Sequence, residues 1–336
     1  MSLASREANY DGASCRDGLA ALVSRTFPGL SLTNHRLDQS GGDHVLLIVD
    51  EHFAFRFPRM GVRGLGLEIE VLRRLQRRST VNTPAYQFVD PNGRFGGYAY
   101  IAGSALTPAR FEALSPSRQD DILRTAALFL SELHGLSPEL IAPVQEWPLM
   151  WTPAQFSNRG LNELLPTIAD RFPEQGCSIE AFYARYAELR PPRLVVVHGD
   201  FVAEHVLLDE HNDQLSGIID FGDVALGDPA QDFLGFWAYG AAAAGRAVEL
   251  YQPSRPDPDL LERSRDHFIR YSLDRLLGRV VDGDGAAFDP VDLAAEMDVL
   301  LTLQRVTQPT RDQDEDPTGG SNNPPERPVE QEIPCR

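Results

Sequence analysis

The alternation of apolar and polar positions predicts a small antiparallel sheet in the first hundred residues. Two strand-like runs, 44–50 (HVLLIVD) and 52–59 (HFAFRFPR), are separated by a short turn. Two further extended pieces, 85–90 and 97–101, are joined by the turn-forming sequence DPNGRFGG. Between the two pairs a helix is predicted over 64–78, because apolar residues recur at 65, 67, 69, 71, 72 and 75.

From residue 106 onward the pattern becomes mainly helical. The segment 115–136 (SPSRQDDILRTAALFLSELHGL) has a long apolar face, with Ser117 as the predicted N-cap and Gly135 as the stop signal. Short strands are predicted within 193–220, and the other predicted helices cover 178–189, 230–251, 258–278 and 290–305. The last thirty residues are rich in proline, glycine and charge, which predicts a disordered tail.

These elements predict an α+β fold with two lobes, and a chain of 336 residues is long enough for both. The small lobe is an antiparallel sheet with one helix, and the larger lobe is mainly helical. The predicted boundaries are an N-terminal segment with a short helix at 1–36, the small lobe at 37–101, the helical lobe at 102–306 and the tail at 307–336.

Composition and charge argue against nucleic acid as a partner, and the sequence contains no lysine. The net charge of −18 argues against a nucleic-acid partner, which requires a basic surface. No apolar run approaches the roughly 20 residues of a membrane span, and the start is too polar for a secretory signal, so we expect a cytoplasmic monomer. Cys15, Cys177 and Cys335 lie far apart, and we expect free thiols. All 31 basic residues are arginine, so any role that needs a fixed cation falls to arginine.

The candidate chemistry lies in 197–223 (VHGDFVAEHVLLDEHNDQLSGIIDFGD). Asp200 follows a buried-looking strand, His205 opens the next one, and Asp220 ends a third. A hairpin turn near DEHND would bring all three side chains around one point. Phosphoryl transfer needs such a set, because one carboxylate must take the proton of the attacking hydroxyl while other groups hold the metal. This assigns Asp200 as the base and Asp220 with His205 as metal ligands, whereas a zinc site would leave Asp200 without a role.

This stretch resembles the catalytic and metal-binding loops of the aminoglycoside phosphotransferases, antibiotic kinases that share the protein-kinase fold. The matching sequences are His-Gly-Asp, His205 five residues after Asp200, and IIDFGD, and the resemblance extends over about 38–240. Both the 2''-aminoglycoside branch and the macrolide branch carry histidine at the second metal position, and SELH with IIDFGD fits the 2'' branch best. The resemblance implies ATP or GTP as co-substrate, Mg²⁺ with Mn²⁺ as a possible substitute, and a small-molecule hydroxyl as acceptor.

The resemblance also implies supporting residues around the two loops. His198 and Asp223 would support the catalytic and metal-binding loops, and Asp228 would order the loop that follows them. We expect Asp232 to begin a helix.

Other residues are candidates for nucleotide binding. Ser40, Gly41 and Gly42 of DQSGGDH could offer backbone amides to phosphate. Arg56 lies between aromatic residues on an alternating strand, where a charged group needs a reason. The family's usual residue there is lysine paired with a helix glutamate, although the macrolide branch also has arginine. Glu68, or failing that Glu70, is the expected partner of Arg56.

The nucleobase is expected to meet the backbone of the segment that joins the lobes, namely Tyr98, Tyr100 and Ile101. That segment leaves the choice between ATP and GTP open.

Three functions stay open at this point. The first is an aminoglycoside-type O-phosphotransferase involved in antibiotic resistance. The second is a kinase of a macrolide or another natural product, favoured by Arg56 and by the apolar sequence 233–251, which reads either as a core helix or as an apolar acceptor pocket. The third is a nucleotide-binding pseudokinase, which rests only on the missing lysine. Carboxylates that could bind a cationic aminoglycoside occur further on, at Glu249, Asp257, Asp259, Glu262 and Asp266.

Overall fold

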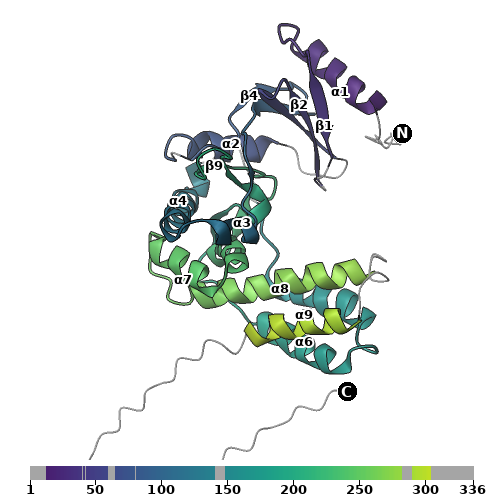
Figure 1. Ribbon diagram of the computed structural model, residues 1–336, viewed down its shortest axis with the longest axis vertical. Helices are drawn as coiled ribbons and strands as arrows, with labels where there is room; N and C mark the ends of the chain where they lie inside the picture. The colour runs from purple at the N-terminus through teal and green to yellow at the C-terminus, as the bar shows by residue number, and fades with distance from the viewer. Residues whose placement is uncertain are drawn as a thin grey trace, which may run out of the picture. The chain divides into compact units, whose positions relative to one another are not determined.

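The computed structural model describes residues 13–39, 41, 43–59, 65–79, 81–140, 148–281 and 290–303. The chain divides into two compact units, of which the first comprises Met1–Trp151 with Arg190–Phe268 and the second Thr152–Leu189 with Ile269–Arg336. The predicted α+β class is confirmed, with an antiparallel sheet followed by mainly helical structure (Figure 1). The predicted tail at 307–336 lies outside the described residues.

A five-stranded sheet forms the start of the first unit. Its order is β1-β2-β3-β5-β4, and every neighbouring pair is antiparallel. The strands are β1 (His35–Asp38), β2 (His44–Val49), β3 (Phe53–Pro58), β4 (Tyr86–Val89) and β5 (Gly96–Ala99). Thus both predicted strand pairs are present, and β1 is an additional edge strand.

Side chains alternate between the two faces of this sheet, and this alternation determines the face on which Arg56 lies. Leu47 and Phe55 lie opposite each other and belong to an apolar cluster with Leu19 and Val23 of α1 (Ala13–Thr26). The helix α1 therefore covers this face of the sheet (Figure 1). Arg56 is the next residue along β3, so its side chain leaves on the opposite face.

The helix α2 (Gly66–Leu75) supplies the partner of that cation. Its apolar residues Val71, Leu72 and Leu75 are buried in the main core of the first unit. Glu68, one turn earlier on α2, is also buried. Burial of these three apolar residues therefore fixes the orientation of α2, with Glu68 within reach of Arg56 on β3.

The rest of the first unit is built around α4 (Pro116–His134). The N-cap of α4 is Ser115, whose hydroxyl oxygen accepts a hydrogen bond from the backbone N–H of Arg118. The predicted cap at Ser117 is therefore wrong, and the reason is Pro116, which suits the first helical position because it lacks an N–H. The predicted end at Gly135 is confirmed.

Short elements complete this unit. They are β6 (Ser104–Ala105), α3 (Pro108–Ala113), η1 (Pro138–Leu140), β7 (Val195–Val197), η4 (Ala203–His205), β8 (Val206–Leu208), β9 (Leu215–Ile218), β10 (Ala225–Gly227), η5 (Pro229–Tyr239) and α7 (Ala241–Leu250). The predicted hairpin is β8–β9, with β6 beside β8, while β7 pairs with β10.

The apolar sequence that begins at residue 233 belongs to the core. Phe233, Phe236 and Trp237 on η5 are buried in the main cluster of the first unit. The cavity beside Phe236 has a volume of about 10 Å³, which is too small for a ligand. Residues 233–237 therefore follow the core alternative, while an acceptor pocket along the rest of 233–251 stays a prediction.

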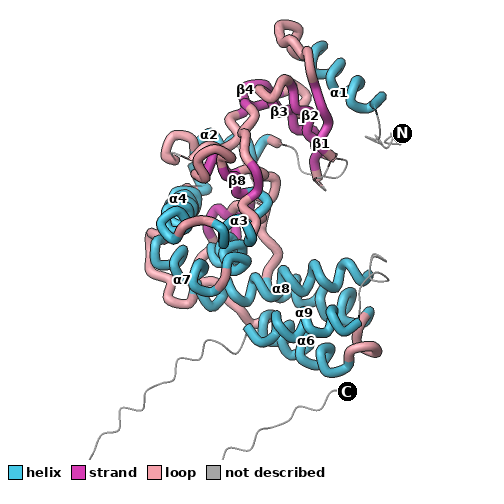
Figure 2. The backbone as a smooth tube through the Cα atoms, viewed as in Figure 1, coloured by secondary structure: helices cyan, strands magenta, loops and turns pink. Residues whose placement is uncertain are grey.

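The second unit consists of helices and loops among its described residues (Figure 2). Ile179 and Phe182 of α6 meet Leu273 and Leu277 of α8, with Met297 of α9, in one apolar core. Its elements are α5 (Pro153–Arg159), η2 (Gly160–Leu164), η3 (Leu165–Thr167), α6 (Pro173–Tyr186), the end of α8 (Leu260–Val281) and α9 (Pro290–Thr302).

Cys177 on α6 is disulfide-bonded, so the expectation of a free thiol is wrong for this residue.

Across the described ranges, every helix is too short or too polar to cross a membrane.

Candidate active site

The turn after β7 requires glycine at its centre. Gly199 has φ of +88°, and a Cβ added to it would lie 2.5 Å from the carbonyl oxygen of Asp223. Other residues rarely adopt that backbone conformation, and none fits that space. The glycine of His-Gly-Asp therefore allows the loop of Asp200 to lie directly against the loop of Asp220.

Asp232 fixes the backbone of the same turn. Its carboxylate, which is fully buried, accepts hydrogen bonds from the backbone N–H groups of His198 at 2.7 Å and Gly199 at 2.9 Å. It also accepts one from Nε2 of His134 at 3.0 Å, and Nδ1 of His134 accepts one from the hydroxyl of Tyr251 at 2.8 Å. Asp232 does lie in the first turn of η5, as expected, but its contacts show a second task, the ordering of the turn before Asp200. Sequence reasoning missed His134, although SELH was recognised as a matching sequence.

His198 joins the two loops. Its Nε2 donates to the carbonyl oxygen of Ile219 at 3.0 Å, and its Nδ1 accepts from the backbone N–H of Asp200 at 3.4 Å. Burial lowers the pKa of His198 to about 4, so the ring is neutral at physiological pH. These are the contacts of a residue that orders the loop, which is the supporting position expected for it.

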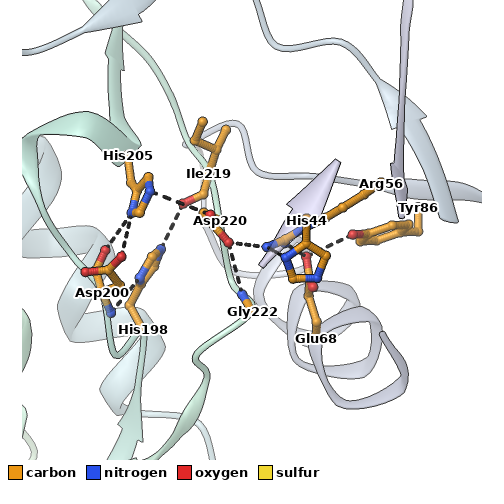
Figure 3. A network of polar contacts seen from close by, with 10 residues as sticks. All are labelled: His44, Arg56, Glu68, Tyr86, His198, Asp200, His205, Ile219, Asp220 and Gly222. Atoms are coloured by element: carbon orange, nitrogen blue, oxygen red, sulfur yellow. Dashed lines mark hydrogen bonds and ion pairs between the residues drawn. The ribbon is translucent and has the colours of Figure 1, made fainter. Parts of the chain in front are cut away.

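Asp200, His205 and Asp220 lie together, as the hairpin argument predicts (Figure 3). Nδ1 of His205 is 2.8 Å from the carbonyl oxygen of Asp200, and Nε2 is 3.6 Å from Oδ2 of Asp220. Because a carbonyl oxygen can only accept, Nδ1 carries a proton, and in the neutral ring the lone pair of Nε2 faces Asp220. A backbone carbonyl that orients a histidine in this way is typical of metal-binding histidines.

The carboxyl group of Asp200 has the properties of a base. Its side chain is 34% exposed, and Nδ1 of His205 lies 3.5 Å from its Oδ2. Burial raises the pKa of Asp200 to about 6, and the charges of Asp223 and Asp220 act in the same direction, while His205 opposes them. A carboxylate with a pKa near neutrality accepts a proton more readily than an ordinary aspartate.

Asp220 and His205 are the residues that could hold a metal ion. Asp220 has φ of +64°, which is uncommon for a residue other than glycine, and its carboxylate lies between Arg56 and His205. Across the described part of the chain, no three histidine, cysteine or acidic side chains gather into a closed metal site. Mg²⁺ commonly takes one or two carboxylates with waters and phosphate oxygens, so Asp220 suits it, whereas an imidazole such as that of His205 is a less usual ligand for this ion.

Arg56 and Glu68 form the buried ion pair expected from the sequence. Nη1 of Arg56 donates to Oε1 of Glu68 at 2.7 Å, and the hydroxyl of Tyr86 donates to the same oxygen at 2.9 Å (Figure 3). Nη2 of Arg56 donates to Oδ1 of Asp220. The cation of β3 is thereby linked to the metal-binding loop.

The alternative partner of Arg56 lies elsewhere. Glu70 forms ion pairs with Arg73 at 3.0 Å and Arg74 at 3.2 Å on its own helix. The geometry therefore selects Glu68.

The glycine-rich segment is held at its base by Arg59. Nη2 of Arg59 donates to the carbonyl oxygens of Gln39 and Gly41, each at 3.3 Å. Ser40 and Gly42, the other candidate phosphate-binding residues, lie outside the described residues. Gly41 is thus tied to Arg59, which directly follows β3, the strand that carries Arg56.

The three candidate nucleobase-binding residues have different surroundings. Tyr98 on β5 is buried, with its ring centroid 5.1 Å from that of Tyr86. The backbone N–H of Tyr100 donates to the carbonyl oxygen of His52 at 2.8 Å, so that donor is already in use. Ile101 follows the end of β5.

Some of the later carboxylates have structural partners. Asp228 accepts both Nε and Nη2 of Arg263, each at 2.9 Å, and lies 3.2 Å from Nε2 of His267. Asp257 accepts from the same guanidinium at 2.8 Å, and Asp266 is buried. Asp228 therefore orders its loop as expected, and Asp257 and Asp266 are not exposed carboxylates for a cationic ligand.

The architecture and the two facing loops are those of a phosphotransferase with a kinase-like fold. The chain belongs to the phosphotransferase enzyme family (APH), whose model matches residues 36–263. The resemblance read from the sequence is confirmed, and the protein is a phosphotransferase.

Several relatives that match the chain are named as antibiotic phosphotransferases. The chain is 27% identical over 245 residues to viomycin phosphotransferase of Streptomyces vinaceus, a match that covers 68% of this chain and 82% of the relative. It is also 27% identical over 157 residues to an aminoglycoside 3'-phosphotransferase of Escherichia coli, covering 44% and 55% of the two chains.

Solved structures share the fold. The GDP and kanamycin complex of APH(2")-IIia has a TM-score of 0.69 at 22% identity, covering 86% of this chain and 98% of that one. A macrolide 2'-phosphotransferase type I has a TM-score of 0.57 at 19% identity, covering 87% and 98%. At these identities the likeness establishes the kinase-like fold.

Proposed function

We propose that this enzyme transfers the γ-phosphate of ATP or GTP to a hydroxyl group of an aminoglycoside-type antibiotic. The observation that carries the proposal is the position of Asp200, partly exposed and with its raised pKa, beside His205 and Asp220. The names of the antibiotic kinases among its relatives support the class of acceptor.

Asp200 is the residue that would act on the acceptor. Its carboxylate would accept a hydrogen bond from the acceptor hydroxyl and take up the proton as the new oxygen–phosphorus bond forms. Asp232 and His198 would hold the backbone of Asp200 in place during this step. The loop is therefore organised before the substrate arrives, which lowers the cost of reaching the transition state.

The other groups would act on the nucleotide. Arg56, held by Glu68, would bring a permanent positive charge to the phosphates. His205 and Asp220 would bind Mg²⁺, or Mn²⁺ in its place, which when bound neutralises charge on the phosphate oxygens.

Two alternatives to the proposal have less support. A macrolide kinase is favoured by Arg56, but the first part of the apolar sequence that also favoured it, residues 233–237, is core. A pseudokinase was suggested by the missing lysine, yet Arg56 makes the ion pair that a lysine would make.

The acceptor is tested with a substrate panel. Kanamycin, viomycin and a macrolide are each incubated with the enzyme and either ATP or GTP, and release of nucleoside diphosphate is measured. The phosphorylated product is then located by mass spectrometry. Phosphorylation of an aminoglycoside supports the proposal, whereas turnover of the macrolide alone would replace it with the first alternative.

The role of Asp200 is tested with Asp200→Asn, which preserves shape and removes the base. We expect kcat to fall by about 10²–10⁴-fold, the usual contribution of general base catalysis, with nucleotide affinity unchanged. Asp17→Asn on α1 is the control, because that carboxylate is exposed and α1 covers the opposite face of the sheet. Near-normal turnover by Asp200→Asn would show that Asp200 is not the base.

A further inference from the structure

One buried polar group beside Arg56 has no assigned role, namely the imidazole of His44. His44 is the first residue of β2 and is 7% exposed. Leu46 lies directly opposite Arg56, and His44 precedes it by two residues, so His44 and Arg56 share one face of the sheet. This face also carries the link from Arg56 to Asp220 (Figure 3).

The hydrogen bond to Arg56 fixes which nitrogen of His44 carries the proton. Nδ1 lies 2.9 Å from Nη2 of Arg56, and a guanidinium can only donate, so Nδ1 is the acceptor. In the neutral ring the proton is then on Nε2. Burial, with the charge of Arg56 as the second cause, lowers the pKa of His44 to about 4, which favours this neutral form.

Nε2 of His44 is a buried donor that finds no acceptor in the described part of the chain. A buried N–H without an acceptor costs about 1–3 kcal/mol, so such groups in native proteins are rare and call for an explanation. One explanation is that a ligand supplies the acceptor, because Nε2–H of His44 would then be satisfied when the ligand binds.

The surroundings indicate what kind of ligand this is. Cε1 of His44, the ring atom next to Nε2, lies 3.2 Å from the point where a Cβ on Gly222 would be. The same point is 2.9 Å from Nη2 of Arg56 and 3.4 Å from Oδ1 of Asp220. The cation of Arg56, the neutral ring of His44 and the candidate metal ligand Asp220 thus meet beside Gly222, where no side chain would fit. This combination of groups suits phosphate oxygens.

We propose that Nε2–H of His44 donates a hydrogen bond to a non-bridging oxygen of the β- or γ-phosphate of the bound nucleotide. His44 thereby favours nucleoside di- and triphosphates over monophosphates, and Arg56 sets its tautomer. This inference rests on the proposed nucleotide-dependent phosphotransferase function.

Two substitutions separate this role from a structural one. In His44→Asn the amide oxygen can take the place of Nδ1 and accept from Arg56, but the distal donor is lost. In His44→Gln the amide nitrogen reaches the position of Nε2 and restores an N–H there. His211→Asn is the control, because His211 is exposed in the β8–β9 turn.

The affinities of the full-length wild type and variants for AMP, ADP and ATP are measured by isothermal titration calorimetry with Mg²⁺ present. A hydrogen bond to a charged group is worth about 1.5–3 kcal/mol, so we expect His44→Asn to bind ADP or ATP about 10–100-fold more weakly. Its AMP affinity should stay within about twofold of wild type. His44→Gln should recover most of the lost affinity, and His211→Asn should match wild type.

The other outcomes are distinguishable. Unchanged ADP and ATP affinity in His44→Asn would overturn the proposal, and so would an equal loss for AMP, ADP and ATP, which would indicate a role confined to holding Arg56. Failure of His44→Gln to recover ADP or ATP affinity, with a thermal unfolding midpoint equal to that of wild type, would also overturn it. If the wild type bound no nucleotide, the proposed function itself would fail first.

Discussion

Replacement of Arg56 by methionine would leave the carboxylate of Glu68 buried without its cation. The Arg56 and Glu68 side chains are only 5% and 4% exposed, so water cannot replace the lost contact. Tyr86 would remain as a single donor to Glu68, while Asp220, whose side chain is 42% exposed, can be hydrated. Removing one partner of such a buried pair costs about 3–5 kcal/mol, a large fraction of the stability of a typical domain.

A double-mutant cycle measures this coupling. The free energy of unfolding is obtained from urea denaturation for Arg56→Met, Glu68→Gln and the double variant. Because Glu68→Gln removes the stranded charge, we expect the double variant to be more stable than the sum of the single losses implies, by about 1–3 kcal/mol. Additive losses would refute the assignment of a buried, mutually dependent pair.

An exposed pair on the same sheet is the control. Nε of Arg36 lies 2.9 Å from Glu51, but the two side chains are 51% and 60% exposed. Such a pair contributes about 0–1 kcal/mol, so Arg36→Met should shift the unfolding curve little. If Arg36→Met and Arg56→Met lost the same unfolding free energy, the effect would come from removal of a positive charge and not from burial of the pair.

Two other predictions concern the loops around the site. Gly199→Ala should lose activity and about 1–3 kcal/mol of stability, measured by turnover and urea unfolding, because the residue has φ of +88° and its new methyl group would meet the carbonyl oxygen of Asp223; wild-type stability would show that the turn can move. Burial alone would raise the pKa of Asp228, but hydrogen bonds from His267 and Arg263 outweigh it and hold the pKa well below its usual range. The stability due to this carboxylate is therefore full above its unfolded pKa near 4 and is lost as the pH falls through the lower folded value. The difference in unfolding free energy between wild type and Asp228→Asn should be constant above about pH 5 and shrink in acid; a constant difference down to pH 2 would contradict the shift.

The sequence predicted the elements whose signal is local. The strands around Phe55 and the helix of Glu68 follow from alternation and from helical periodicity, and His205 between two carboxylates showed the site. The start of α4 was placed two residues late, because two serines flank Pro116 and either could cap the helix.

Contacts between distant segments could not be read in this way. Asp232 and His134 are 98 residues apart, and only the packed core brings them together at the turn before Asp200. His44 looks like an ordinary strand residue until the tautomer imposed by Arg56 is known. Residues 233–237 have the same apolar sequence whether they form a core or a pocket, so only burial separates the two.

The use of arginine at position 56, in a chain without lysine, has a practical consequence for chemical proteomics. Reagents that label nucleotide sites by acylating an amine need an unprotonated lysine near the phosphates. This chain contains no lysine, and Arg56 stays protonated and poorly nucleophilic at any usable pH. An occupied, fully active site would therefore leave no adduct with such a reagent, and surveys of resistance enzymes that depend on amine labelling would pass over this protein. Reversible capture on an immobilised nucleotide would be the suitable means of detection.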